Sequence, residues 1–202
     1  MKRVIFVLPG LFFTTPANAH GAMAGGGGFY SGAAHPFMAW EHLLLLLAIG
    51  VLLGRGPKQN ARLPLLCLAT SLVAGLAAGA AGLGLSLLPG FILGVGILSG
   101  LLLASGMIPS VAATTFLTVT AGIAIGLDTD VPVLTAASNL DAYTTYIGVI
   151  VAVSLIVLNS MALSLTVRRA SWTIGLQILG SWIAAISLMV LTLKLSNLTG
   201  TS

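Results

Sequence analysis

Two histidines and a glutamate stand close together in HPFMAWEH, residues 35 to 42, at the start of a long apolar run. The chain has only three histidines and four acidic residues, so His35, Glu41 and His42 gather much of its ligand chemistry here. An unpaired carboxylate inside an apolar helix is costly, which makes Glu41 a candidate functional residue. Because imidazole and carboxylate together suit Ni²⁺, Co²⁺ and Zn²⁺, the stretch predicts a metal site.

The spacing of these residues indicates how they would share an ion. His35 and His42 are seven residues apart, about two helical turns, so a continuous helix would put both on nearly the same face. Glu41 is turned from His42 by about 100°. We expect His42 and Glu41 to hold one ion, with His35 as the ligand nearest the entrance. The alternative for each histidine is an interfacial residue beside Trp40, an aromatic typical of membrane boundaries.

A second acidic segment, GIAIGLDTD at residues 122 to 130, ends a later apolar run. If that run crosses outward, Asp128 and Asp130 reach the same outer side as Glu41. We therefore add Asp128 to the predicted ligands and interpret Asp130 as a solvated loop charge, which is also the alternative for Asp128. The single cysteine, Cys67, lies in an apolar run, so neither an intrachain disulfide nor a Cu(I) thiolate cluster is expected.

The composition shows which solvent surrounds these ligands. Of 202 residues, 57% are hydrophobic and 6% are charged, against about 25% charged in soluble domains. This indicates an all-α, polytopic membrane bundle, in which each helix needs roughly 20 apolar residues. The basic residues are scattered, so the net charge of +4 does not predict a nucleic-acid partner. Six transmembrane helices are expected, at residues 36–54, 63–84, 91–107, 111–127, 146–166 and 174–194.

The first nineteen residues have the pattern of a cleaved secretory signal peptide. Two basic residues precede the short apolar run VIFVLPGLFF, and Ala17-Asn18-Ala19 is a small-x-small cleavage site. An uncleaved first helix is the alternative. Cleavage would leave His20 at the N-terminus, where its amine and imidazole can chelate a metal. The expected domains are a signal peptide at 1–19, a flexible Gly-rich extracytoplasmic leader at 20–34 and the six-helix domain at 35–202.

The charges outside the spans predict the orientation. With the mature N-terminus outside, five of the six remaining basic residues fall on the inner side: Arg55, Lys58, Arg62, Arg168 and Arg169. The exception is Lys194, at the outer end of the last span. We therefore expect a multi-pass protein of the bacterial inner (plasma) membrane, with both mature termini extracytoplasmic.

Three GxxxG motifs indicate how the helices pack. They pair Gly75 with Gly79, Gly96 with Gly100 and Gly122 with Gly126. Small residues at this spacing let two backbones approach closely inside lipid. The motifs predict a tight bundle.

The first-span motif resembles that of the HupE/UreJ family, small membrane proteins associated with hydrogenase and urease gene clusters and regarded as nickel or cobalt permeases. The family pattern is His-x5-Asp-His, and His35, Glu41 and His42 fit it with glutamate in the acidic place. The predicted signal peptide, followed directly by His20, also resembles the family. The resemblance covers most of the chain.

The family's fourth-span motif, His-Gly-x-Ala-His-Gly-x-Glu, is only partly kept. Residues 121 to 128 read AGIAIGLD, which retains both glycines, the alanine and an acidic end at Asp128. Ala121 and Ile125 replace the two histidines and cannot ligate. The resemblance therefore implies a site that binds a transition metal more weakly than the full motif would, or that takes a different ion. The matching positions of the two motifs suggest a three-plus-three inverted repeat by analogy with other transporters.

The resemblance implies a permease for a divalent metal ion, with Ni²⁺ or Co²⁺ as the first candidates. No tightly bound cofactor is expected. The ion would be held by His42, Glu41 and Asp128 and released inward, and Asn159 and Gln177 either line its path or make interhelical hydrogen bonds. The alternative is a non-transporting scaffold or assembly subunit of a larger membrane complex. An enzyme is not expected because every histidine precedes residue 43. The lipid bilayer and the ion are the expected partners, and a membrane-protein partner or a second copy of the chain stays open.

Overall fold

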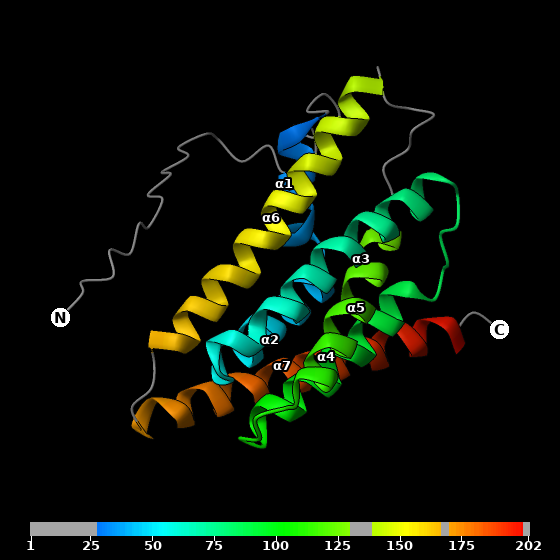
Figure 1. The fold of residues 1–202 in the computed structure, drawn as a ribbon. Helices are drawn as coiled ribbons and strands as arrows, with labels where there is room; N and C mark the ends of the chain where they lie inside the picture. Colours follow the sequence, from blue (N-terminus) through cyan, green and yellow to red (C-terminus); the bar gives the residue numbers. More distant parts are fainter. Residues whose placement is uncertain (1–27, 130–138, 167–169, 200–202) are drawn as a thin grey trace, which may run out of the picture.

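The protein is an all-α bundle in the computed structural model, which describes residues 28–129, 139–166 and 170–199. The predicted signal peptide, His20 and Asp130 lie outside the described residues. The helices are α1 Phe29–Met38, α2 Trp40–Arg55, the 3₁₀ helix η1 Lys58–Ala61, α3 Arg62–Ala80, α4 Leu88–Ala104, α5 Val111–Asp128, α6 Asn139–Thr166 and α7 Ala170–Thr199 (Figure 1).

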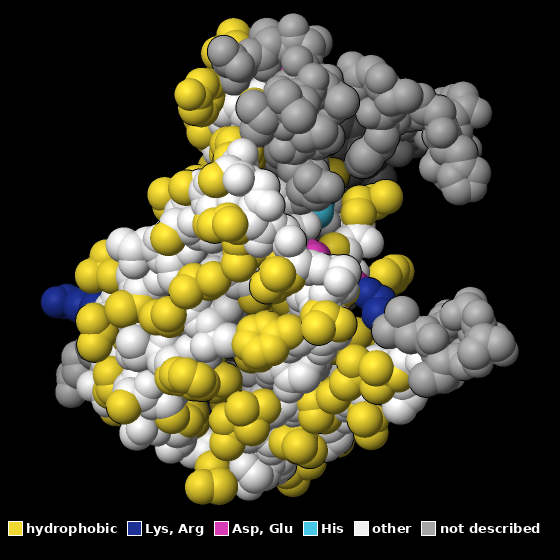
Figure 2. Space-filling model, turned by 90° about the vertical axis from the view of Figure 1, so that its right-hand side faces the viewer, with side chains coloured by type: hydrophobic (Ala, Val, Ile, Leu, Met, Phe, Trp, Pro, Cys, Tyr) yellow, Lys and Arg dark blue, Asp and Glu magenta, His cyan; other side chains and the backbone are white. Residues whose placement is uncertain are grey.

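A helix lies at each of the six predicted spans, and the chain is a multi-pass membrane protein by its apolar helices. Four stretches are long and apolar enough to cross a bilayer by themselves: Arg62–Ala80, Val111–Asp128, Leu140–Thr166 and Thr173–Ser196. The pair α1 and α2 makes a fifth if it is counted as one broken span. The apolar α4 has 17 residues, so six complete spans remain a prediction. Apolar side chains cover much of the surface, as lipid contact requires (Figure 2).

The expectation of one continuous first helix at residues 36–54 is wrong. Helices α1 and α2 meet at Ala39, which has φ −92° and ψ 96°, and their axes differ by 81°. Pro36 lies three residues before the break and removes one amide donor from the end of α1.

Helix α1 also begins earlier than expected, at Phe29, so residues 29–34 are helical and not the flexible leader predicted there. The reason is close packing on α6, beside which α1 lies in Figure 1. A Cβ atom added to Gly148 of α6 would come within 2.8 Å of the Ala33 nitrogen. The two backbones are therefore in contact, which orders α1 in spite of its small residues.

The glycine motifs do mark helix contacts, as predicted. On α3 and α5, Gly75 and Gly126 face each other, and a Cβ atom on Gly75 would lie 2.5 Å from the Ile123 oxygen. On α4 and α7, a Cβ atom on Gly100 would lie 2.8 Å from the Gly180 oxygen. Backbone atoms occupy the space that a side chain would need, so these helices pair only because the residues are glycines.

Helix α2 lies at the centre of the bundle, in contact with α4, α5, α6 and α7. Ten of its 16 residues are buried, including Leu45, Leu46 and Ile49. Its last residue, Arg55, donates to the carbonyls of Leu103 (2.9 Å) and Gly106 (3.1 Å) at the end of α4. The arginine that was interpreted as an orientation signal thus also satisfies helix-end carbonyls, which lack intrahelical donors.

Replacing Gly75 by alanine is expected to lower the free energy of unfolding by about 1–3 kcal/mol, because the new methyl group would meet backbone atoms that have no room to move. The matched control is Gly94→Ala on α4, where a Cβ atom meets nothing within 4 Å. There the helix propensity of alanine should leave stability unchanged or raise it by up to about 1 kcal/mol. Unfolding of both variants in mixed detergent micelles, followed by circular dichroism, measures the difference; equal midpoints would contradict the packing interpretation.

Candidate metal-binding site

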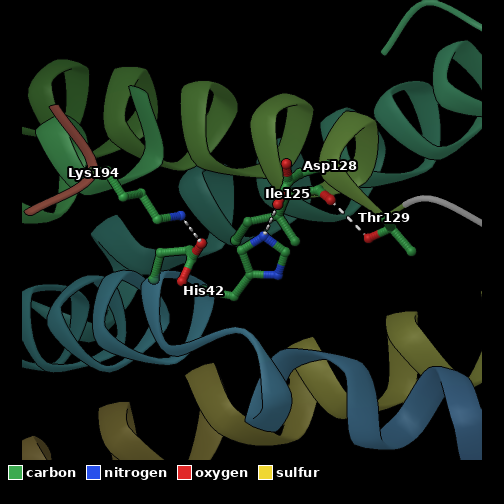
Figure 3. A network of polar contacts seen from close by, with 6 residues as sticks. His42, Ile125, Asp128, Thr129 and Lys194 are labelled. Carbon is green, nitrogen blue, oxygen red and sulfur yellow. Dashed lines mark hydrogen bonds and ion pairs between the residues drawn. The ribbon is translucent and has the colours of Figure 1, made fainter. Parts of the chain in front are cut away.

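The centre of the candidate site is a contact between α2 and α5. His42, in the first turn of α2, is fully buried, and its Nε2 atom lies 2.9 Å from Oδ2 of Asp128, the last residue of α5 (Figure 3). The two residues are 86 positions apart in the chain. The approach of Asp128 to the head of the first span, expected from topology alone, is therefore present in the structure.

The last turn of α5 holds Asp128 in position. The amide of Thr129 donates to the Ile125 carbonyl at 3.0 Å, and its hydroxyl donates to the same oxygen at 2.7 Å. Thr129 is itself buried. The Ile125 carbonyl thus accepts two hydrogen bonds from the buried Thr129, so α5 ends in an ordered turn beside His42.

The break at Ala39 brings His35 close to His42. In a continuous helix a separation of seven residues would be about 10 Å along the axis. Instead, the two ring centroids are 5.2 Å apart, with the rings tilted by 59°. Nε2 of His35 and Nδ1 of His42 are both buried with no hydrogen-bond partner. A buried nitrogen without a partner costs about 1–3 kcal/mol, so both atoms are suited to bind an incoming ligand.

Glu41 does not join this cluster but pairs with the far end of the chain. Its Oε1 atom lies 2.8 Å from Nζ of Lys194 on α7. Sequence reasoning missed Lys194, which it treated only as an exception to the charge rule. Two signals could have found it: a carboxylate in an apolar helix needs a partner, and Lys194 is the one basic residue expected on the same side.

The four predicted ligands are thus brought to one region without surrounding a single point. His35, His42 and Asp128 form one group, and Glu41 belongs to a neighbouring ion pair. Among the described residues, no three His, Cys, Asp or Glu side chains are arranged so that they could hold a metal ion. In the space-filling view, histidine, acidic and basic side chains lie near one another in a hollow of a mostly apolar surface (Figure 2).

The two polar residues suggested for an ion path lie elsewhere. Asn159 is exposed and donates to the Leu155 carbonyl of its own helix at 2.7 Å. Gln177 lies beside Gly106, near the Arg55 end of α2. Neither residue is part of the His42 region.

Comparison with known families decides the membership of the chain. The family described as HupE / UreJ protein matches residues 8–190. The chain belongs to the HupE/UreJ family. No curated protein and no solved structure matches it. The membership fits a membrane protein linked to nickel or cobalt uptake and favours a transporter over an enzyme.

The positions at which the HupE/UreJ motif has histidines can now be located. Ala121 and Ile125 are both completely buried on α5, and Ile125 lies one turn before Asp128, next to His42 in Figure 3. The two motif positions that lack histidine therefore lie in the interior of the bundle and not on its surface.

Replacing Asp128 by alanine should lower the free energy of unfolding by about 1–3 kcal/mol, because it leaves the buried His42 nitrogen without a partner. In His42→Leu that nitrogen is absent, so Asp128→Ala should cost less in this background. A double-mutant cycle of reversible unfolding in mixed micelles measures the coupling. Strictly additive effects of the two substitutions would mean that the contact contributes nothing to the fold.

Proposed function

We propose that this HupE/UreJ protein is a permease for a divalent transition-metal ion, with Ni²⁺ and Co²⁺ as the first candidates for the transported ion. The observation that carries the proposal is the contact of His42 with Asp128, because it joins the last histidine of the first family motif to the acidic end of the second. We place the protein in the bacterial inner membrane with both mature termini outside, from its charge distribution.

The chemistry of the cluster suits such a substrate. Neutral imidazole nitrogens and carboxylate oxygens together favour borderline first-row ions. His35 and His42 each have a buried nitrogen that makes no hydrogen bond. In the proposed cycle the ion passes His35, is held by His42, Asp128 and Glu41, and leaves inward when the helix packing changes. Glu41 has to leave Lys194 for this to happen.

The pattern of helix pairs is compatible with a three-plus-three inverted repeat. If α2, α3 and α4 correspond to α5, α6 and α7, the α3–α5 pair is equivalent to the α6–α2 pair, and both are extensive. The same correspondence exchanges α4 with α7, so the contact between these two helices maps onto itself. Among the described residues, however, the α2–α4 contact has no counterpart of similar extent between α5 and α7. A repeat of this kind would supply the two alternative packings that a permease needs.

Replacing the proposed ligands should slow metal uptake strongly. Cells expressing Glu41→Gln, His42→Ala or Asp128→Asn are expected to take up ⁶³Ni²⁺ and ⁵⁷Co²⁺ at least about tenfold more slowly than cells with the parent chain. The matched control is Asp141→Asn, which changes a carboxylate on α6 outside the cluster and should leave uptake unchanged. Rates are compared at equal membrane levels of protein. If well-folded parent protein gives no uptake above background, the scaffold or assembly subunit becomes the better interpretation.

Restoring one family histidine should strengthen metal binding. Ile125→His would add an imidazole beside His42 and Asp128, and we expect the Kd for Co²⁺ to fall by roughly tenfold. The control is Ile123→His on the same helix, where the side chain is exposed. Titration of the purified protein, followed by the visible absorption of bound Co²⁺, measures both variants. Equal affinities would show that α5 does not face the bound ion.

A further inference from the structure

Lys194 and Glu41 form the one intramembrane Lys–carboxylate pair within the described part of the chain. Lys194 Nζ lies 2.8 Å from Glu41 Oε1, although the residues are 153 positions apart. The side chains differ in burial, with Lys194 42% exposed and Glu41 14% exposed. The carboxylate of Glu41 is thus mostly buried, while the Lys194 side chain on α7 is partly exposed.

The pair lies directly beside the His42 cluster, because Glu41 and His42 are consecutive in α2. A lysine near the end of an apolar helix ordinarily turns its amine toward water and the headgroups. Lys194 turns toward Glu41 instead, and its exposed fraction shows that space is available for the side chain to move away.

The charges around Glu41 and Asp128 explain why Lys194 would have to move when a divalent cation binds. With neutral histidines, Glu41 and Asp128 carry two negative charges, and Lys194 balances one of them. A divalent cation would balance both carboxylates by itself. If Lys194 stayed in place, the region would carry one excess positive charge, which is unfavourable where water is scarce.

We propose that Lys194 is a tethered competitor of the transported ion: its ammonium occupies Glu41 in the empty protein, leaves when a divalent cation binds, and returns when the ion departs. This inference rests on the proposed metal site and adds a residue that sets its affinity. By competing for Glu41, Lys194 weakens binding and favours release of the ion. The rival interpretation is a permanent ion pair that only joins α2 to α7.

The reactivity of the Lys194 amine distinguishes these interpretations without requiring transport. Purified full-length protein in detergent is treated with an acylating reagent, with or without Ni²⁺ or Co²⁺, and the modified peptides are quantified by mass spectrometry. We expect saturating metal to raise Lys194 acylation by about threefold or more, as the loss of a partly exposed ion pair should. Lys58 is the internal reference, Mg²⁺ is the control ion, and Glu41→Gln without metal gives the upper limit. Unchanged Lys194 acylation at saturating metal would overturn the proposal.

The affinity of the protein for Ni²⁺ gives a second, independent test of the competitor role of Lys194. Equilibrium dialysis with ⁶³Ni²⁺ should show a Kd about three- to tenfold lower for Lys194→Gln than for the parent, because the competing charge is gone. Lys194→Arg keeps that charge and should bind no more tightly than the parent, and Lys58→Gln removes a lysine elsewhere and should leave the Kd unchanged. Equal Kd values for Lys194→Gln and the parent would overturn the proposal. If Lys194→Gln does not fold, the acylation of the parent chain decides.

Uptake separates the failure of this inference from the failure of the proposed function. Metal-dependent acylation in a chain that gives no uptake would support the competitor role while contradicting the permease. Uptake by a parent chain whose Lys194 acylation does not respond to metal would support the permease and leave Lys194 as a fixed link between helices.

Discussion

Inside a bilayer no hydrophobic force draws helices together, so each contact depends on how closely two backbones can approach. The protein meets this constraint with glycines at the contacts between paired helices, such as Gly75 against α5 and Gly100 against α7. Asp128 is the last residue of α5, which packs extensively on α3 and also contacts α2. The proposed site, built from the ends of different helices, therefore depends on contacts far from its proposed ligands.

The first turn of α2 connects these contacts to chemistry. Consecutive residues reach two different helices, since Glu41 pairs with α7 and His42 with α5. Binding of a cation by either side chain would alter a link between helices as well as a local charge. A small change in ligation can thus bias the packing of the whole bundle, which a bistable membrane protein requires.

Hydropathy was sufficient to locate all the helices of the six apolar runs, and topology was sufficient to bring Asp128 to the head of the first span. Neither could predict the break at Ala39, because Pro36 is compatible with a continuous, kinked helix. The helical residues 29–34 were missed because their order comes from contact with α6. The partner of Glu41 was missed for a similar reason: a pairing over 153 residues leaves no local signal.

The break between α1 and α2 has a mechanical consequence. His35 belongs to a helix that packs mainly on α6, whereas His42 belongs to the central helix. The separation of the two imidazoles is therefore controlled by rotation about the backbone dihedrals at Ala39, independently of the bond between His42 and Asp128. A movement of α6 along the bundle would change the His35–His42 distance through this joint, so α6 would help to set the position of His35, the outermost of the proposed ligands, although α6 carries none of them itself.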